Sequence, residues 1–436
     1  MKNLICLQKN VLLSICFLLS APLFCSYNAG VKAEWNTAKT ILMHTPGDEL
    51  FCGILHPDAA LFEGPFDMYA AINDLKNYIT ILKQNDIDVI LIEDILLEGT
   101  INENGSKKEG QALDDLINLA KHSLTYTMPS EWSLTEREEQ EEYLDSVLKK
   151  SHPKSLLKII FEKPTIDLKY SPERNTRFIA KYESAPLFNL HFCRDQQITT
   201  DKGVVLGKMN SIQRNLEVDI MEFVFNKLGA TPIYRVTGKG RLEGGDFIPA
   251  GDFALLGQGL RTNEEGVRQL LENNVFDFPE IAIVKDPFQH QDQMHLDTYF
   301  NIIGNGLALV DTIRRETGFV TRGNVTRKIR PSVDVYQKRS CGAYECTQKD
   351  VDFFDYIEKQ KGFKIIDIQD SEQLNYGCNF LCIGDRKIVA VQGVSETYEQ
   401  RLLNAGVDLQ TVDFRNLTKS YGGPHCTTQV LKRTSY

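Results

Sequence analysis

The stretch Tyr421-Gly-Gly-Pro-His-Cys426, followed by Thr-Thr-Gln, lies almost at the end of the chain, and the rest of the sequence is organised around it. Glycine allows backbone angles and close approaches that other residues forbid, and proline restricts the freedom of a turn. The stretch therefore predicts a tight turn that holds one thiol in a defined place. A free cysteine is more often a small buried hydrophobe, so the other motifs have to decide between a structural and a reactive Cys426.

The composition is that of an ordinary large globular protein. The chain has 436 residues, of which 42% are hydrophobic and 25% charged. Such a chain can bury a sizeable core, and its length alone allows two or three domains. The formal net charge is -10, and the sequence contains no block of lysines and arginines. We therefore expect no nucleic-acid partner.

Residues 1–33 have the pattern of a secretion signal. Lys2 and Lys9 precede an apolar run from Val11 to Phe24, which is too short to span a bilayer comfortably and has the length of a signal-peptide core. Val31-Lys32-Ala33 offers small residues for cleavage. We therefore expect an exported protein without a stable membrane span, whose mature chain begins near Glu34. An uncleaved anchor is the alternative.

Seven of the ten cysteines follow the predicted signal. An odd number leaves at least one free thiol even where every other cysteine pairs. Cys341 with Cys346, and Cys378 with Cys382, are the candidates for disulfides or metal binding. Four and three intervening residues are poor spacings for a zinc site, so no metal is expected.

Strand-like and helical segments alternate along the chain. The strand Thr40–His44, the helix Asp67–Gln84 and the strand Asp88–Ile92 form a first unit. Alternation of this kind predicts an α/β fold. The further expected strands are Gly203–Leu206, Thr231–Val236, Ala254–Leu256, Glu280–Val284, Lys364–Asp367, Phe380–Ile383, Ile388–Val391 and Leu409–Val412, and the helices between them are Glu217–Leu228, Asn263–Asn273, Val351–Lys361 and Glu396–Ala405.

The pattern changes to consecutive helices between about residues 110 and 172. Apolar residues at helical spacing predict helices at Leu113–Leu124, Leu134–Lys150 and Ser155–Phe161. The acidic run Glu136–Glu142 is the solvated face of the second of them. We expect this region to be a helical insertion.

Four stretches carry polar residues where apolar or turn residues would serve the structure better. They are Asn189-Leu-His-Phe-Cys-Arg-Asp195, Glu243-Gly-Gly-Asp246, His295-Leu-Asp297 and the cysteine at 426. Alternate side chains of an extended segment share a face, so His295 and Asp297 should point to the same place. Cys426 and His425 should point in opposite directions, which makes His295 the better partner for the thiol.

A cysteine, a histidine and several carboxylates suit nucleophilic attack on a cationic carbon. The thiolate attacks, the histidine moves protons, and carboxylates hold a positively charged substrate. A planar guanidinium pairs with carboxylates bidentately, so two aspartates suit it. Each motif alone also fits an ordinary surface pair or a turn, and only the combination is specific.

Together and in this order, the motifs resemble the guanidino-group-modifying superfamily and, within it, the arginine deiminases. The resemblance extends from about Glu34 to the C-terminus. It includes His44-Thr-Pro-Gly47, Phe192-Cys-Arg-Asp195, Met209–Glu217, Glu243-Gly-Gly-Asp246, Gly257-Gln-Gly-Leu-Arg-Thr262, Met294-His-Leu-Asp-Thr298 and Gly422-Gly-Pro-His-Cys426. It implies a pentein fold, in which five pseudo-symmetric ββαβ modules surround a central pore. Residues 34–436 would form one catalytic domain, with the helical insertion at about 110–172.

The resemblance also implies roles for individual residues. Cys426 corresponds to the nucleophile, His295 to the acid/base, and Glu243 to the residue that orients the histidine. Asp195 and Asp297 correspond to the clamps of the guanidinium group. The positions that bind the amino-acid end of the substrate are Asn189, Arg214 and Arg261, and Phe192 lines the pocket.

The chain departs from the family pattern in three places. Tyr421 stands where some members have an arginine near the substrate, Pro424 replaces a third glycine, and Gln196 replaces a frequent proline. These departures leave the chemistry intact and concern the affinity for the substrate. Export is also unusual, because a cytoplasmic location is typical of the family.

The resemblance implies hydrolysis of L-arginine to L-citrulline and ammonia through a covalent cysteine intermediate, with no cofactor and a small-molecule substrate as the partner. A homo-oligomer is possible. Agmatine deiminase is one alternative, because its Cys-x-Thr-Gln ending matches Cys426-Thr-Thr-Gln429. An amidinotransferase is another. A secreted, non-catalytic arginine-binding protein is an alternative of a different class, although binding alone would not require the thiol.

Overall fold

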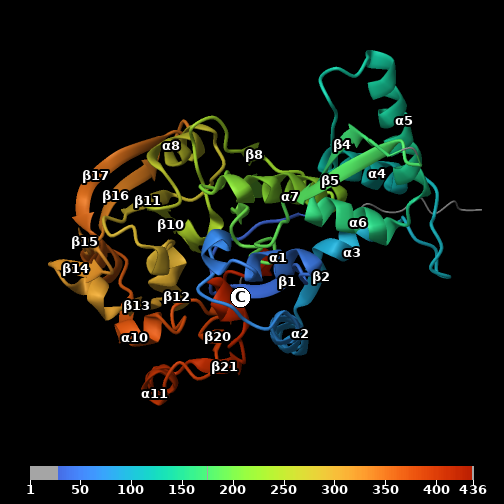
Figure 1. The fold of residues 1–436 in the computed structure, drawn as a ribbon. Helices are drawn as coiled ribbons and strands as arrows, with labels where there is room; N and C mark the ends of the chain where they lie inside the picture. The colour runs from blue at the N-terminus through green and yellow to red at the C-terminus, as the bar shows by residue number, and fades with distance from the viewer. Residues whose placement is uncertain (1–27, 174, 435–436) are drawn as a thin grey trace, which may run out of the picture.

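The computed structural model describes residues 28–173 and 175–434 of the chain (Figure 1). The core of the predicted signal, Val11–Phe24, lies outside the described residues. Within the described ranges, strands and helices alternate as an α/β fold, as the sequence predicts. None of the described helices combines the length and the apolar character that a membrane span requires.

One connection pattern occurs in five sheets of the described chain. Two antiparallel strands are followed by a helical connection and a third strand that pairs in parallel with the second. The clearest case is β9 (Phe247–Ala250), β10 (Phe253–Gln258), α8 (Glu264–Glu272) and β11 (Glu280–Lys285). Gly251 makes the tight turn between the antiparallel strands with φ at 83°, a conformation that favours glycine.

The other four sheets repeat this pattern. They consist of β6 (Gln197–Thr199), β7 (Val204–Leu206), α7 (Asn215–Lys227) and β8 (Tyr234–Arg235); β12 (Phe300–Gly304), β13 (Leu307–Asp311) and β18 (Lys364–Ile368); β19 (Leu381–Gly384), β20 (Lys387–Val391), α11 (Glu396–Asn404) and β21 (Asp408–Val412); and β22 (Gln429–Thr434), β1 (Thr37–Met43), α2 (Met68–Gln84) and β2 (Asp88–Leu91). The last sheet joins the two ends of the described chain.

The connection between β13 and β18 differs from the sequence prediction. A helix is expected over Val351–Lys361, but the strand β17 (Tyr344–Asp352) continues into that range. It pairs with β16 (Ser332–Lys338), which extends the sheet of β11. Helical structure begins only at Phe353, because the Asp352 carboxylate caps the amides of Phe354 and Asp355.

The insertion projects to one side of the molecule (Figure 1) and is not purely helical. Its helices are α4 (Gln111–Ser123), α5 (Leu134–Lys150) and α6 (Pro153–Glu162). The prediction for α5 is confirmed at both ends, since Ser133 and Glu136 form a capping box at its start. The sequence analysis missed the sheet β3 (Thr125–Thr127), β4 (Pro164–Tyr170) and β5 (Phe178–Ser184) that pairs beside these helices.

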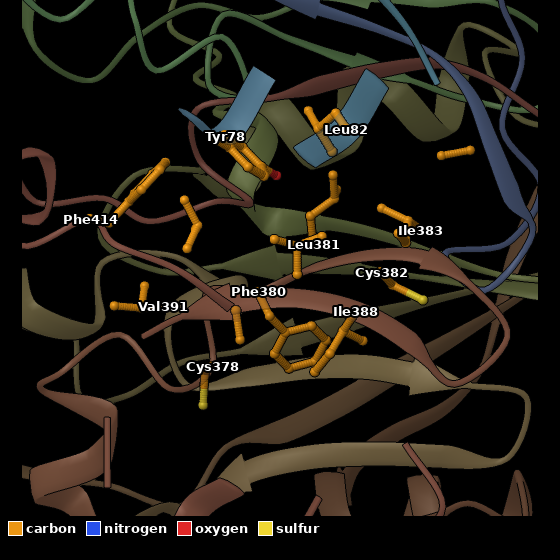
Figure 2. Packing of buried hydrophobic residues seen from close by; sticks show 14 of the residues in the cluster. Tyr78, Leu82, Cys378, Phe380, Leu381, Cys382, Ile383, Ile388, Val391 and Phe414 are labelled. Carbon is orange, nitrogen blue, oxygen red and sulfur yellow. The ribbon is translucent and has the colours of Figure 1, made fainter. Parts of the chain in front are cut away.

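An apolar cluster lies between α2 and the strands β19 and β20 (Figure 2). Tyr78 and Leu82 of α2 pack toward the strands, where Phe380, Leu381 and Ile388 are fully buried. The Tyr78 hydroxyl donates to the carbonyl of Pro424 at 3.1 Å. The cluster therefore supports the turn that carries Cys426.

The first described residues are part of the packed structure. Ala29, Val31 and Ala33 are buried. The amide of Gly30 donates to the Leu431 carbonyl, and the amide of Val31 donates to the Thr200 carbonyl. Residues predicted to leave with the signal thus contact strands of the fold.

Candidate active site

Asn379 holds the turn that presents Cys426. Its Oδ1 accepts hydrogen bonds from the amides of Gly423 at 3.0 Å and Cys426 at 3.2 Å. Its Nδ2 donates to the Cys426 Sγ at 3.1 Å. Gly422 is required beside it, because a Cβ at this position would lie 2.2 Å from the ring of Phe192. The glycine-rich stretch is therefore a tightly fitted support for the thiol.

The environment of Cys426 favours the neutral thiol. Burial raises its pKa well above the ordinary value, and the carboxylates of Asp297 and Asp195 raise it further. Ionisation thus requires a positive charge beside the two carboxylates. A cationic ligand in the site would supply it.

His295 forms a buried ion pair with Glu243. Its Nε2 lies 2.9 Å from the Glu243 Oε2, and both side chains are almost fully buried. Burial lowers the pKa of His295, but the carboxylates of Asp195, Glu243 and Asp246 outweigh this effect and raise the pKa to about 9. Burial raises the pKa of Glu243, but the hydrogen bond from His295 and the charge of Arg261 hold it at about 2. The histidine is therefore an imidazolium at neutral pH.

Asp195, Glu243 and His295 place three potential metal-ligand atoms within 4.8 Å of one another. A metal requires neutral imidazole as a ligand, whereas His295 is protonated in this environment. Proton transfer is therefore the chemistry that the cluster supports better.

The prediction that His295 and Asp297 lie on an extended segment is wrong, although both side chains reach the site. Leu296–Thr298 forms the short 3-10 helix η5. A Cβ added to Gly245 would meet the His295 Nδ1 at 2.7 Å and the Asp297 Oδ1 at 3.0 Å. The second glycine of Glu243-Gly-Gly-Asp246 therefore makes the room in which both side chains converge.

The prediction that His425 and Cys426 point in opposite directions is also wrong. The His425 Nδ1 lies 2.6 Å from the Asp297 Oδ2, and the Cys426 Sγ lies 3.8 Å from the same oxygen. Both contacts are possible because Pro424–Thr427 is a turn and not a strand. Burial lowers the pKa of His425 well below its ordinary value, so the neutral ring donates its Nδ1 proton to Asp297.

Asp195 is held by Arg214, which the family resemblance assigns to the amino-acid end of the substrate. The Arg214 Nη1 donates to the Asp195 Oδ2 at 2.8 Å, and its Nη2 donates to the Glu217 Oε2 at 3.0 Å. The other oxygen of Asp195 lies 3.9 Å from the His295 Nδ1. Arg214 is thus already paired with two carboxylates in this structure.

Seven of the nine predicted site residues line one narrow cleft, with about 350 Å³ of empty space. They are Asn189, Phe192, Asp195, Arg214, Arg261, His295 and Cys426. Glu243 and Asp297 are buried next to the cleft, where Glu243 contacts His295 and Asp297 contacts Cys426. The structure therefore brings together all nine residues that the resemblance implies.

Among the nine predicted residues, three buried polar atoms lack a hydrogen-bond partner within the described chain. They are the Asp195 Oδ1, the Asp297 Oδ1 and the Arg261 Nε. A buried polar group without a partner costs roughly 1–3 kcal/mol, so such groups require an explanation. The two free carboxylate oxygens would accept hydrogen bonds from a cationic group, and the free N–H of Arg261 would donate to an anionic group. A ligand with one cationic and one anionic end satisfies all three atoms.

A wider groove of about 1750 Å³ lies between α8 and the β16–β17 hairpin. Its cations Lys285 and Arg268 are paired with the carboxylates of Asp334 and Glu272. The Cys426 thiol, the His295 imidazolium and the unpartnered carboxylate oxygens belong to the smaller cleft. We therefore place the functional site in the smaller cleft.

Three residues of the site were not predicted from the sequence. Asp246 accepts from the amide of Leu296 at 3.0 Å and thereby fixes the segment that carries His295. Glu217 pairs with Arg214. Both lie in motifs noted from the sequence, whereas Asn379 precedes an ordinary apolar strand and carries no local signal.

Comparisons with known proteins match one family over most of the chain. The family model for arginine deiminase matches residues 58–433. The arginine deiminase of Halobacterium salinarum is 26% identical over 492 residues, which cover 92% of this chain and 96% of the relative. The arginine deiminase of Treponema denticola is 26% identical over 434 residues, which cover 92% of this chain and 98% of the relative.

Solved structures of related enzymes share the fold. The N-terminal domain of ArgZ, a cyanobacterial arginine dihydrolase, superposes with a TM-score of 0.53 at 14% identity, covering 90% of this chain and 97% of that one. Dimethylarginine dimethylaminohydrolase from Pseudomonas aeruginosa superposes with a TM-score of 0.51 at 15% identity, covering 90% and 99%. At these identities the likeness concerns the fold alone.

Proposed function

Because the chain belongs to the arginine deiminase family, we propose that it hydrolyses L-arginine to L-citrulline and ammonia in the cleft beside Cys426. One observation carries the proposal: the buried Oδ1 atoms of Asp195 and Asp297 are unpartnered in the described chain, and Cys426 and His295 lie beside them. A guanidinium group has five N–H donors in a rigid fork and satisfies such acceptors.

The substrate itself activates the thiol. The carboxylates of Asp297 and Asp195 disfavour the Cys426 thiolate, and a bound guanidinium neutralises their effect. The Asp297 Oδ2, 3.8 Å from the Sγ, is placed to accept the thiol proton. The thiolate then attacks the central carbon of the guanidinium group.

His295 serves both halves of the reaction. As an imidazolium it donates a proton to the departing nitrogen, the carbon–nitrogen bond breaks, and ammonia leaves an S-alkylthiouronium on Cys426. The neutral imidazole then takes a proton from water, whose oxygen attacks the same carbon. The carbon–sulfur bond breaks, the hydroxyl proton of the adduct passes to the departing sulfur, and citrulline is released. The proton that Asp297 took from the thiol leaves with ammonia as ammonium, and Glu243 holds the ring in place through both steps.

Arg261 is the better candidate for the carboxylate of arginine. Its Nη2 donates to the Gln291 Oε1 at 2.7 Å, and its Nε is unpartnered in the described chain. Arg214 is engaged by Asp195 and Glu217 and would have to change partners. We therefore assign the anionic end of the substrate to Arg261 first. A charge-assisted contact contributes about 1.5–3 kcal/mol.

An assay of purified protein with arginine and with agmatine tests the proposal. Agmatine lacks the carboxylate, so kcat/KM for arginine should be higher by about 10- to 100-fold from Arg261 alone. Citrulline and ammonia should form in equal amounts, and adding glycine as an amine acceptor should not divert the amidino group. Similar kcat/KM for both substrates would support agmatine deiminase, transfer to glycine would support an amidinotransferase, and tight binding of arginine without turnover would support a binding protein.

We also propose that the five repeated units form a closed propeller of pseudo-symmetric modules. Contacts between β22 and β6, β9 and β12, β12 and β19, and β19 and β1 support this arrangement. A bridge between Lys208 and Leu242 links the remaining pair of neighbours. An experimental structure that leaves an open gap between two modules would contradict the proposal.

Export remains a proposal that rests on the apolar run Val11–Phe24 and the preceding lysines. The burial of Ala29 and Val31 favours processing before Ala29 over processing at Ala33, because the later site would remove packed residues. N-terminal sequencing of protein from the native source tests this. An intact Met1 in a soluble cytosolic fraction would contradict export. Homo-oligomer formation also stays a prediction, which light scattering of the purified protein would decide.

A further inference from the structure

Asn379 precedes β19 and reaches the nucleophile turn with both ends of its amide. The residue is 2% exposed. Its Oδ1 accepts from the amides of Gly423 and Cys426, and its backbone carbonyl accepts from the amide of His425 at 3.2 Å. Its Nδ2 donates to the Cys426 Sγ. Few side chains can hold a loop and its reactive atom at the same time.

The orientation of the amide follows from its partners. Two backbone N–H groups point at one end of the side chain, and a backbone N–H can only donate. That end must therefore be the oxygen, since a flipped amide would set N–H groups against N–H groups. The NH₂ group consequently faces the sulfur.

The sulfur needs such a donor. Burial and the carboxylates of Asp297 and Asp195 all oppose a negative charge on Cys426. His425, the residue before Cys426, is neutral and donates to Asp297. The hydrogen bond from Asn379 is the largest influence in the opposite direction, and the amide of Gly423 adds to it.

We propose that Asn379 is a catalytic residue of this enzyme, whose Nδ2 hydrogen bond stabilises the charge that develops on the Cys426 sulfur during attack and departure. The amide gains and loses no proton, so it contributes as a fixed dipole aimed at the reacting atom. The inference rests on the proposed role of Cys426 as the nucleophile.

Asn301 provides a matched control. It is 1% exposed, and its Nδ2 donates to the carbonyls of Cys378 and Phe380, which flank Asn379, at 3.0 Å each. It therefore holds the same segment, while none of its side-chain hydrogen bonds within the described chain involves the thiol. A substitution at Asn301 therefore measures how loosening this segment changes the reactivity of Cys426.

The test compares Asn379→Ser, Asn379→Asp and Asn301→Ser with the wild type. Serine is too short to reach the sulfur, and aspartate retains the acceptor for the loop amides. Each protein is treated with iodoacetamide over a range of pH, and modification of Cys426 is followed by peptide mass mapping, with Cys426→Ala as the background. Thermal unfolding shows which variants fold, and kcat and KM are measured for arginine.

In Asn379→Ser, the alkylation rate near neutral pH should fall about tenfold or more, because loss of the Nδ2 hydrogen bond raises the thiol pKa further. We expect kcat to fall by at least as much while KM changes less than about threefold. Asn301→Ser should leave the alkylation profile unchanged. If Asn379→Ser does not fold, Asn379→Asp takes its place, since it retains the acceptor that holds the loop. It removes the donor and adds a negative charge beside the sulfur, so its alkylation rate should fall at least as far.

Two results would overturn the proposal: equal shifts in the Asn379 and Asn301 variants, or an unchanged alkylation profile in the Asn379 variants that fold. Either result leaves the proposed function intact if Cys426→Ala is inactive. Turnover by Cys426→Ala would instead remove the proposed mechanism, whatever Asn379 does.

Discussion

Two regions of this molecule meet between consecutive residues, Asn379 and Phe380. Phe380 is fully buried in the apolar cluster behind β19 (Figure 2), and Asn379 belongs to the polar site around Cys426. The apolar side chains can be buried without hydrogen-bond partners. The polar site buries Asp195, Asp297 and His295 to a similar degree and leaves carboxylate oxygens unpartnered in the described chain.

The difference separates stability from reactivity. Burying apolar side chains stabilises the fold by about 1.5–3 kcal/mol for each large residue. Burying charges that are incompletely paired is unfavourable, and the apolar region has to compensate for it. The hydrogen bond from Tyr78 to Pro424 connects the supporting region to the reactive one. Substitutions in the two regions should therefore have opposite effects. In the polar site they should lower activity without lowering stability, and in the apolar region they should lower stability and leave kcat unchanged.

The largest effect is expected for Cys426→Ala in the polar site. Turnover of arginine should be lost, because Cys426 is the proposed nucleophile that forms the covalent intermediate. Thermal unfolding should stay close to that of the wild type, since the change removes one small buried atom. Citrulline formation and a melting curve measure both. Activity within about tenfold of wild type, which corresponds to only about 1.4 kcal/mol of barrier, would exclude the thiol as the nucleophile.

Leu82→Ala should produce the opposite signature in the apolar region. Leu82 is fully buried on α2, and truncation of such a leucine costs about 2–5 kcal/mol of unfolding free energy. The protein that remains folded should retain its kcat. Denaturant unfolding and active-site titration separate the two quantities. Leu55→Ala, at a leucine that is 67% exposed, is the control and should change stability by less than about 0.5 kcal/mol.

Asp297→Asn should stabilise the protein while it removes activity. Burial raises the pKa of Asp297 from 3.8 to about 6, so the folded protein binds this proton more tightly than the unfolded chain does. The carboxylate therefore destabilises the fold above about pH 6, and the penalty disappears as the pH falls toward about 4. Above pH 6 we expect a gain of about 1–3 kcal/mol.

Denaturant unfolding of both proteins at several pH values measures this gain. The advantage of Asp297→Asn should shrink as the pH is lowered through about 6. A variant that is less stable than the wild type at every pH would show that Asp297 contributes to the fold through His425 more than its burial costs.

The smallest effect is the pH dependence of kcat/KM. The free enzyme needs ionised Asp297, with a pKa of about 6, and protonated His295, with a pKa of about 9. The rate constant should therefore form a bell, which falls about tenfold for each pH unit below and above these values. A steady-state profile with arginine tests it. A rate that keeps rising above pH 9 would contradict the need for an imidazolium.

Asp246→Asn tests the assignment of the acid limb of the pH profile to Asp297 and of the alkaline limb to His295. Asp246 also has a pKa of about 6, raised by burial, but it contacts no reacting atom in the proposed mechanism. The acid limb should therefore remain near 6. The alkaline limb should move to lower pH, because the charge of Asp246 helps to raise the pKa of His295.

Local sequence determined the reactive residue types and many elements. The helix Leu134–Lys150 was predicted to the residue because its cap and its apolar spacing are local. The strand Glu280–Val284 was predicted within one residue because it is a continuous apolar run. The predictions were wrong where pairing between distant strands determines the secondary structure. The strand β17 continues through Asp352 because β16 pairs with it, and β4 and β5 of the insertion pair with each other.

The sequence by itself determined that Cys426, His295, Glu243 and the two aspartates are present, in an order that identifies the family. Tertiary structure decided which of them are protonated and which charges they interact with. The Glu243–His295 and Asn379–Cys426 contacts join residues 52 and 47 positions apart. The engagement of Arg214 with Asp195 and the protonation of His295 likewise depend on burial and on distant charges. Local propensity contains no information on either, because the strength of a charge interaction is set by distance and by exclusion of water.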